Sequence, residues 1–392
     1  MRWIKFLGWV AALAAVGIAA LTACPALRDY LYREGSYAVL LKRVASAERD
    51  PVRLTRQTVR AVHEILYPGG GPVIDTDAWT DLVRGIGWCD QQDWVVGTLL
   101  ALRGVRGRLV MLDDESGVSG HTVMEAYLNG DWRVVDPLYG LMFTRPDGAL
   151  ATREDLSRDL TPLAQHPIVQ QMAPVAREQV MKQYAALFPL RMEPTVWSSV
   201  LDSRSVSRPK AWLARAAQRA WTLGGPAWSA ALQDLYFLWP VSLDQLSKDM
   251  ARERTDRTST REIRRAYRWY VRARNYHLYG RYRKAAAWYQ RVIAAYPQLS
   301  VADRSAAWLG LAQLDAGDRT AALHTFQQFL RDRPDDGWRS RVLDGLARAD
   351  EGQAARQPAS DIVAQALEDP YIPTAQRLAD HLSAGDRPFS VR

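Results

Sequence analysis

Three residues of this chain have side chains that could together carry out thiol chemistry on an amide: Cys89, His121 and Asp136. A thiol attacks an amide carbonyl only as the thiolate, so a nearby group must take its proton and later protonate the departing amine. A histidine that titrates near neutrality can do both. A carboxylate on the far side of the imidazole fixes its tautomer and stabilises the imidazolium.

Taken singly, each of these residues also fits an ordinary structural role. A lone cysteine is commonly a small buried apolar residue, and a lone strand histidine is commonly packed or exposed without a function. Asp136 precedes Pro137, which is typical of turns. The catalytic hypothesis therefore depends on the elements that would bring the three side chains together.

The residues around Cys89 predict a turn that leads into a helix. Residues 85–90 have turn composition, and residues 90–102 carry apolar side chains at helical spacing. Cys89 is thus expected at a helix amino terminus, where free backbone N–H groups and a partial positive charge favour a thiolate. Further helices are expected over residues 29–67 and 76–84.

From residue 108 onward the apolar periodicity becomes that of strands, over residues 108–112, 121–128 and 131–137. Asn129 and Gly130 separate the last two strands. Asn-Gly between two strand-like runs predicts a two-residue hairpin, because both central residues of a type I′ turn need positive φ.

A two-residue loop fixes which residues lie opposite one another. It places Leu128 opposite Asp131, and counting outward places Val123 opposite Asp136. His121 and Asp136 then lie on one face as diagonal neighbours, roughly 7–8 Å apart between backbones, which an imidazole and a carboxylate can bridge.

These segments resemble the transglutaminase-like superfamily, which shares the papain-like arrangement of cysteine, histidine and aspartate. The resemblance rests on Gly87-Trp88-Cys89-Asp90, on the Gly-x-x-x-Arg pattern of residues 104–108, on the strand that begins at His121, and on residues 132–137. Thr122 and Val123 stand where the family has a small residue and a tryptophan. The resemblance implies an α+β papain-like fold with Cys89 as nucleophile, His121 as base and Asp136 as the residue that orients the histidine.

An acyl-transfer site also needs hydrogen-bond donors for the oxyanion that forms on the attacked carbonyl. Trp88 and Gln92 are candidates, beside the backbone N–H of Cys89. No cofactor or metal site is expected.

The amino terminus predicts attachment to a membrane. Arg2 and Lys5 precede an uncharged apolar run over residues 6–23, whose length lies between that of a signal-peptide core and a spanning helix. Leu21-Thr22-Ala23-Cys24 resembles a bacterial lipobox, in which Cys24 would be lipidated. The alternative is an uncleaved signal anchor, and both interpretations place the rest of the chain in the periplasm or outside the cell.

The composition indicates a folded protein and gives no sign of nucleic-acid binding. Of 392 residues, 51 are Lys or Arg and 43 are Asp or Glu, which leaves a formal net charge of +8 with no long single-sign block. No metal-type cysteine spacing or RNA-binding signature is present. The excess of positive charge suits an anionic envelope surface.

Residues 151–265 are expected to be mostly helical and carry no catalytic pattern. Within them, residues 221–243 are rich in aromatic and apolar side chains, and the polar Gln233 and Asp234 argue against a second membrane span. Burial in a core and contact with a membrane surface are the two explanations for this stretch.

A sequence repeat with an offset of 37 residues follows residue 265. Its positions are Ala273, Tyr276, Gly280, Tyr282, Ala285, Tyr289 and Pro297, matched by Gly310, Gln313, Gly317, Arg319, Ala322, Phe326 and Pro334. This resembles the tetratricopeptide motif, in which small residues let paired helices approach. The resemblance implies helical hairpins that bind a protein partner.

The expected organisation is therefore an anchor (1–27), a transglutaminase-like domain (28–150), a helical linker domain (151–265), tetratricopeptide-like repeats (266–350) and a tail (351–392). The expected function is that of an exported, membrane-attached thiol enzyme that acts on a peptide or another amide through a Cys89 thioester. Hydrolysis is favoured over cross-linking, because the sequence indicates no amine-binding pocket. The alternative is a non-catalytic envelope scaffold whose repeats bind partners in surface-polysaccharide or secretion machinery.

Overall fold

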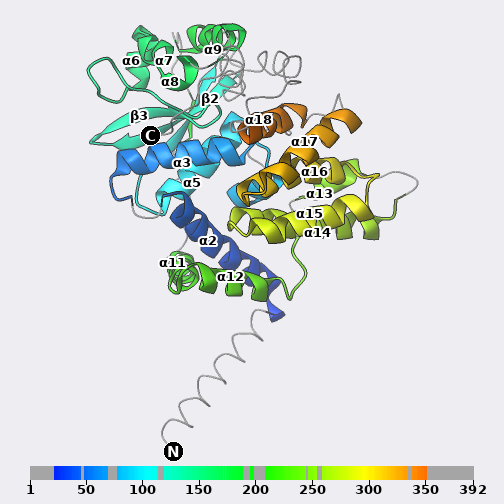
Figure 1. Cartoon of the computed structure of the whole chain (residues 1–392). Coiled ribbons are helices and arrows are strands. Elements are labelled where there is room, and N and C mark those ends of the chain that lie inside the picture. Colours follow the sequence, from blue (N-terminus) through cyan, green and yellow to red (C-terminus); the bar gives the residue numbers. More distant parts are fainter. Residues whose placement is uncertain are drawn as a thin grey trace, which may run out of the picture.

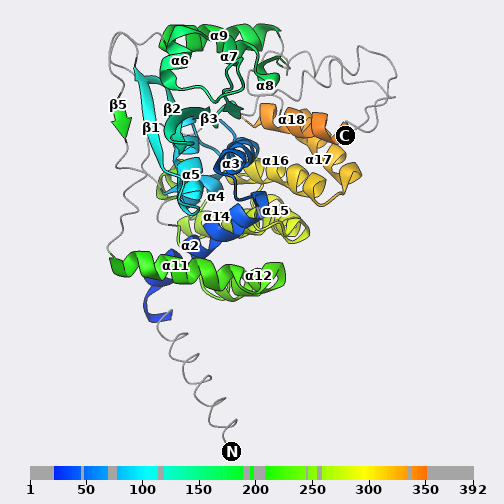
Figure 2. The same ribbon diagram turned by 90° about the vertical axis from the view of Figure 1, so that its left-hand side faces the viewer.

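The chain has an α+β fold in which helices pack around an antiparallel sheet (Figures 1 and 2). The computed structural model describes residues 22–45, 48–68, 77–113, 119–170, 172, 174–188, 195–197, 208–243, 246–253, 258–333 and 338–350. The order of the strands is β4-β3-β2-β1-β5. The strands are β1 (Gly107–Asp113), β2 (Ser119–Leu128), β3 (Asp131–Asp136), β4 (Leu141–Met142) and β5 (Thr195–Trp197).

The β2–β3 hairpin has the turn and the register that the sequence predicts. Asn129 and Gly130 both have positive φ, 54° and 87°. Leu128 lies opposite Asp131, and the pairing continues to Met124 opposite Val135. The β2–β3 pairing ends at that pair, and the other edge of β3 pairs with β4 through Val135 and Asp136. The end of β2 that carries His121 is therefore not covered by β3.

Alternate residues of the strands point into two different hydrophobic cores. Met124 and Ala126 of β2 pack with helices on one face of the sheet, whereas Val123 packs with helices on the other. The helices on the first face include α3 (Pro51–Ile65), α4 (Ala78–Arg84) and α5 (Cys89–Ala101). Those on the second face are α6 (Arg153–Arg158), α7 (Thr161–Ala164), α8 (Pro167–Gln170) and α9 (Pro174–Leu187).

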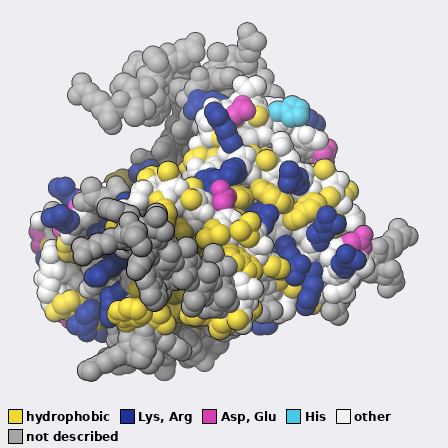
Figure 3. Space-filling view, turned by 90° about the horizontal axis from the view of Figure 1, so that it is seen from below, with side chains coloured by type: hydrophobic (Ala, Val, Ile, Leu, Met, Phe, Trp, Pro, Cys, Tyr) yellow, Lys and Arg dark blue, Asp and Glu magenta, His cyan; other side chains and the backbone are white. Residues whose placement is uncertain are grey.

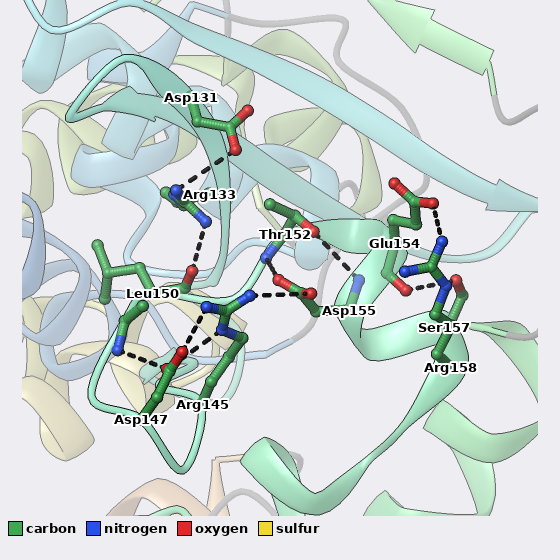
Figure 4. Close-up of polar contacts among 11 residues, drawn as sticks. Asp131, Arg133, Arg145, Asp147, Leu150, Thr152, Glu154, Asp155, Ser157 and Arg158 are labelled. Carbon is green, nitrogen blue, oxygen red and sulfur yellow. Dashed lines mark hydrogen bonds and ion pairs between the residues drawn. The ribbon is translucent and has the colours of Figure 1, made fainter.

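A network of polar contacts fixes the loop between β4 and α6 to the sheet (Figure 4). Arg133 of β3 donates through Nη1 to the Leu150 carbonyl at 2.6 Å. Arg145 pairs with Asp147 at 2.5 Å and with Asp155 of α6 at 3.4 Å. These contacts hold α6 close to the strand that ends in Asp136.

The long helix expected over residues 29–67 is instead two helices, α2 (Pro25–Val44) and α3. Asp50 accepts a hydrogen bond from the backbone N–H of Arg53 at 3.1 Å, and Pro51 occupies the first turn of α3. Both are helix-start signals, and they outweigh the apolar periodicity that continues across the break.

The remaining helices form the lower and right-hand parts of the molecule in Figure 1. They are α11 (Arg208–Thr222), α12 (Gly225–Tyr236), α13 (Ser247–Arg252), α14 (Thr260–Leu278), α15 (Tyr282–Ala295), α16 (Ser300–Asp315), α17 (Arg319–Asp332) and α18 (Arg339–Asp350). The predicted sequence repeat coincides with two successive helical hairpins, α14–α15 and α16–α17. Gly280 and Gly317, which are equivalent in the repeat, have φ of +75° and +81° in the two turns.

Several contacts cross the residue numbers at which domain boundaries are expected. Helices α6–α9, which follow residue 150, share a core with the sheet. Helix α2 packs against α11, where Gln218 donates to Glu34 at 2.8 Å. The strand β5 pairs with β1, although residues 151–265 contain no recognisable strand pattern.

The apolar run at residues 6–23 lies outside the described residues except for Thr22 and Ala23. Of the helices in the described ranges, none is both long enough and apolar enough to cross a membrane.

Candidate active site

Cys89 is the first residue of α5, one position earlier than the sequence predicts for the start of this helix. The turn before it is held by side chains: the Trp88 backbone N–H donates to Gln91 Oε1 at 3.0 Å. Gln91 in turn donates to Asp81 Oδ1 at 2.9 Å. The N–H of Cys89 has no acceptor within the helix, because the first N–H groups of a helix lack one. Cys89 as a residue is partly exposed.

His121 joins Cys89 to Asp136. Its Nε2 lies 2.5 Å from Asp136 Oδ2. The ring also makes a hydrogen bond with the thiol of Cys89, and because Nε2 faces Asp136, this second bond is made by Nδ1. The backbone N–H of Thr122 donates to Cys89 Sγ at 3.4 Å. This N–H is free to do so because β2 and β3 separate beyond Met124. The structure thus brings together the three residues that the sequence singled out.

The carboxylate of Asp136 is completely buried, and both of its oxygens accept hydrogen bonds. Oδ1 accepts from the backbone N–H groups of Leu138 at 2.9 Å and Tyr139 at 3.4 Å. Oδ2 accepts from the hydroxyl of Tyr184 in α9 in addition to His121. The carboxylate is therefore fixed in one orientation toward the imidazole.

Tyr184 is a site residue that sequence reasoning missed. It lies 48 residues after Asp136 in the chain, within a segment that shows no catalytic pattern. Burial, followed by the charge of Asp136, raises the pKa of Tyr184 well above its ordinary value. The hydroxyl consequently keeps its proton and remains a donor to Asp136.

The electrostatics of the site favour a protonated imidazole. Burial alone lowers the pKa of His121, but the charge of Asp136, its hydrogen bond and the hydrogen bond to Cys89 outweigh it and raise the pKa to about 10. An imidazolium between a carboxylate and a sulfur stabilises the thiolate form of the sulfur. The site therefore places a protonated imidazole next to the sulfur of Cys89.

Asp93 is a second residue that sequence reasoning missed. It lies one turn after Cys89 on α5, is completely buried, and neither of its side-chain oxygens has a hydrogen-bond partner among the described residues. Burial, and then the charges of Asp136, Cys89 and Asp90, raise the pKa of Asp93 well above 3.8. Its spacing of four residues from Cys89 was a usable signal, because such residues share a helix face.

The two candidate oxyanion donors are placed differently from one another. The Trp88 side chain is 38% exposed, and its backbone N–H is engaged with Gln91. Gln92 is buried, and its Nε2 donates to the Gly87 carbonyl at 2.9 Å. The backbone N–H of Cys89 is thus the donor best placed for the oxyanion that would form on a carbonyl attacked by the sulfur.

The turn that leads to Cys89 is supported from the carboxyl-terminal half of the chain. Arg274 of α14 donates to the carbonyls of Leu82 at 2.8 Å and Val83 at 3.2 Å, at the end of α4. The Tyr270 hydroxyl donates to the Arg84 carbonyl at 2.8 Å. The last carbonyls of α4, which have no partner within the helix, are therefore capped by α14.

Two further contacts fasten the same turn. The Arg84 guanidinium makes two hydrogen bonds with Asp249 of α13, at 3.0 and 3.2 Å. Gly85 has φ of +73°, and a Cβ at this position would lie 2.4 Å from the indole ring of Trp308 in α16. The turn is thus wedged between α13 and α16.

Cys24, the candidate lipidation residue, is exposed and directly precedes α2. The start of α2 lies at the opposite end of the molecule from α6–α9 (Figure 1). Within the described ranges, no group of three or more His, Cys, Asp or Glu side chains is arranged to hold a metal ion.

Comparisons of the chain with known protein families, with functionally characterised proteins and with solved structures find no match.

Proposed function

We propose that this chain is a thiol-dependent amide hydrolase of transglutaminase-like type. The observation that carries the proposal is the hydrogen-bonded series Cys89, His121 and Asp136, in which histidine and aspartate are buried and Cys89 is partly exposed. A reactive group open to substrate, with its base and orienting carboxylate fixed behind it, is the arrangement that nucleophilic catalysis requires.

The proposed reaction has two stages. The Cys89 thiolate attacks an amide carbonyl to form a C–S bond, and the oxyanion is stabilised by the Cys89 backbone N–H. Collapse breaks the C–N bond, and the His121 imidazolium gives its proton to the departing amine. Water, deprotonated by His121, then attacks the thioester to form a C–O bond. Collapse breaks the C–S bond, which releases a carboxylic acid and regenerates the thiolate beside the imidazolium. A peptide or another amide-bearing molecule is the proposed substrate class.

The proposed setting is the bacterial envelope, with the chain held by residues 6–23 or by a lipid on Cys24. The helical hairpins α14–α15 and α16–α17 fit a tetratricopeptide-like region that binds a protein partner. Helix α14 of this region contacts the turn before Cys89, which supports a function in which the partner-binding region and the site act together.

The proposal is tested by the reactivity of Cys89 in the full chain. We expect iodoacetamide to alkylate Cys89 rapidly at pH 6–7, and His121→Ala to lower this rate at least about tenfold, because the variant lacks the imidazolium that stabilises the thiolate. Mass spectrometry of the Cys89 peptide measures the rate separately from any reaction at Cys24.

Tyr127→Phe, an exposed change elsewhere on β2, serves as the matched control and should leave the rate unchanged. Slow alkylation of Cys89, at a rate that His121→Ala does not alter, would refute the proposal that the chain is a thiol enzyme. Cys89→Ala would then leave the function of the chain intact, as the scaffold alternative requires.

A further inference from the structure

The described residues with large exposed apolar side chains are concentrated at one end of the molecule. Five of the eight lie between residues 212 and 238, on α11, on α12 and in the turns that follow these helices. They are Trp212, Leu223, Trp228, Leu235 and Leu238. Scattered exposed apolar residues are normal on a protein in water, but a cluster of this kind marks a surface that contacts another apolar phase.

The inner side of helix α12 carries two buried polar residues beside Tyr236, and its outer side carries large apolar residues. Its buried side includes Ser229 and Gln233, whereas Trp228 and Leu235 point outward. Ser229 donates to the Trp221 carbonyl at 2.7 Å, and Gln233 donates to the Asn275 carbonyl at 3.0 Å. A surface helix surrounded by water carries apolar residues inward and polar residues outward. The outer face of α12 is therefore suited to an apolar surrounding.

Helix α11 adds positive charge to the same end of the molecule. Trp212, Arg215, Arg219 and Leu223 follow one another at intervals of three or four residues, so they share one face. Both arginines are exposed and have no acidic partner among the described residues. Aromatic, aliphatic and arginine side chains on one face are typical of helices that lie in a membrane interface.

The single acidic residue in residues 208–236, Asp234, is held in ion pairs. Asp234 pairs with Arg281 at 2.8 and 3.0 Å and with Lys284 at 3.1 Å, and it accepts from the Tyr276 hydroxyl at 2.9 Å. Its charge is compensated by α14–α15 and the turn between them. Figure 3 shows this lower end, where apolar and basic side chains are numerous and acidic ones are few.

The same surface adjoins the point at which the amino-terminal apolar run ends. The Trp239 indole donates to Thr22 Oγ1 at 3.2 Å, the Tyr236 hydroxyl donates to Asp29 at 3.1 Å, and the Tyr32 and Tyr236 rings are stacked with centroids 3.7 Å apart. The start of α2 is thus fixed to the end of α12. Whether residues 6–23 span a bilayer or Cys24 carries a lipid, the bilayer begins beside this surface.

We propose that the outer faces of α11 and α12 lie in the surface of an anionic lipid bilayer. The molecule then stands on the membrane through its lower end in Figure 1, with the sheet and α6–α9 directed away from the lipid. Trp212, Trp228, Leu235 and Leu238 enter the headgroup region, while Arg215 and Arg219 pair with lipid phosphates. This orientation rests on the expected attachment through residues 6–23 or Cys24 and is independent of the proposed reaction.

Photo-crosslinking in the full chain tests the proposal without altering the anchor. The photoreactive amino acid benzoylphenylalanine is placed at the position of Trp212 or Leu238, and for control at that of Val175, which is 52% exposed on α9 at the opposite end. The protein is reconstituted into vesicles of phosphatidylglycerol and phosphatidylcholine, irradiated, and analysed by mass spectrometry for lipid adducts. We expect adducts at the first two positions with a yield about tenfold above that at Val175, because only interfacial side chains remain in contact with lipid.

Arg215→Glu combined with Arg219→Glu should lower the yield at Leu238 severalfold, because the reversed charges are repelled by phosphatidylglycerol. Equal yields at Leu238 and Val175 would overturn the proposal. Crosslinks from Leu238 to a second copy or to another protein in place of lipid would also overturn it, as would a chain that does not float with the vesicles.

Discussion

At the scale of single residues, the site depends on groups that serve two roles at once. One oxygen of Asp136 caps the turn at Leu138 and Tyr139, and the other holds His121. The turn that an Asp-Pro pair predicts and the hydrogen-bonded series Cys89, His121 and Asp136 are therefore both present, and they share one carboxylate. Tyr184 completes the set by donating to the oxygen that faces the histidine.

Asp93 shows that the site is also under electrostatic strain, because a buried carboxyl without a hydrogen-bond partner is costly. Its pKa is raised well above 3.8 by burial first and then by the charges of Asp136, Cys89 and Asp90. The native state therefore keeps a proton that the unfolded chain releases above about pH 4. The contribution of Asp93 to native stability consequently falls as the pH rises from about 4 toward the raised pKa, by at most about 1.4 kcal/mol per pH unit.

We expect Asp93→Asn, which keeps the shape of the side chain, to remove this loss of stability. The variant should match the wild type near pH 4 and exceed it increasingly toward pH 7, since asparagine has no proton to release. Urea unfolding of both proteins across this range measures the difference. A difference that does not change with pH would show that Asp93 is ionised in the native state.

At the scale of elements, local signals start the helices and strands, and contacts from distant helices hold them in place. Asn129 and Gly130 set the β2–β3 register. The turn from α4 into α5 also needs contacts from a distant helix, because the last carbonyls of α4 accept hydrogen bonds from Arg274 and Tyr270 of α14. The position of Cys89 therefore depends on a helix of the repeat region.

We expect Arg274→Met to destabilise the protein by about 2–4 kcal/mol and to slow alkylation of Cys89. Methionine retains apolar contact with Trp308, over which the guanidinium lies at 3.6 Å, but leaves the carbonyls of Leu82 and Val83 without donors. Thermal unfolding and the iodoacetamide rate measure the two effects. Arg261→Met, an exposed change on the same helix, is the control and should alter neither quantity. Normal alkylation in a destabilised Arg274→Met protein would show that α14 does not position the thiol.

At the scale of the whole molecule, one hydrophobic core runs from α2 through α5 and the sheet to α18. The helices after residue 258 thus belong to the same packed body as Cys89, whether or not they also bind a partner. The second core lies between the sheet and α6–α9 and supplies Tyr184. The site lies where the two cores meet.

We expect a chain that ends at residue 253 to lose its cooperative unfolding transition, because removal of α14–α18 uncovers the apolar face of α4 and the carbonyls that α14 caps. Circular dichroism on heating and limited proteolysis measure this loss. A chain that ends at residue 350 keeps every contact described above and should unfold like the full chain. Cooperative unfolding of the shorter chain would show that the helices after residue 258 form a separate domain.

The sequence by itself determined the features that depend on neighbours along the chain. Turn chemistry at Asn129-Gly130 and helical spacing after Cys89 predicted the elements that bring Cys89, His121 and Asp136 together, because hairpin register and helix starts are local. Only the tertiary structure revealed the contacts of Tyr184 and Arg274, the environment of Asp93, the pairing of β5 and the apolar outer face of α12. These depend on packing between segments that are far apart in the chain, and no local spacing of side chains encodes that packing.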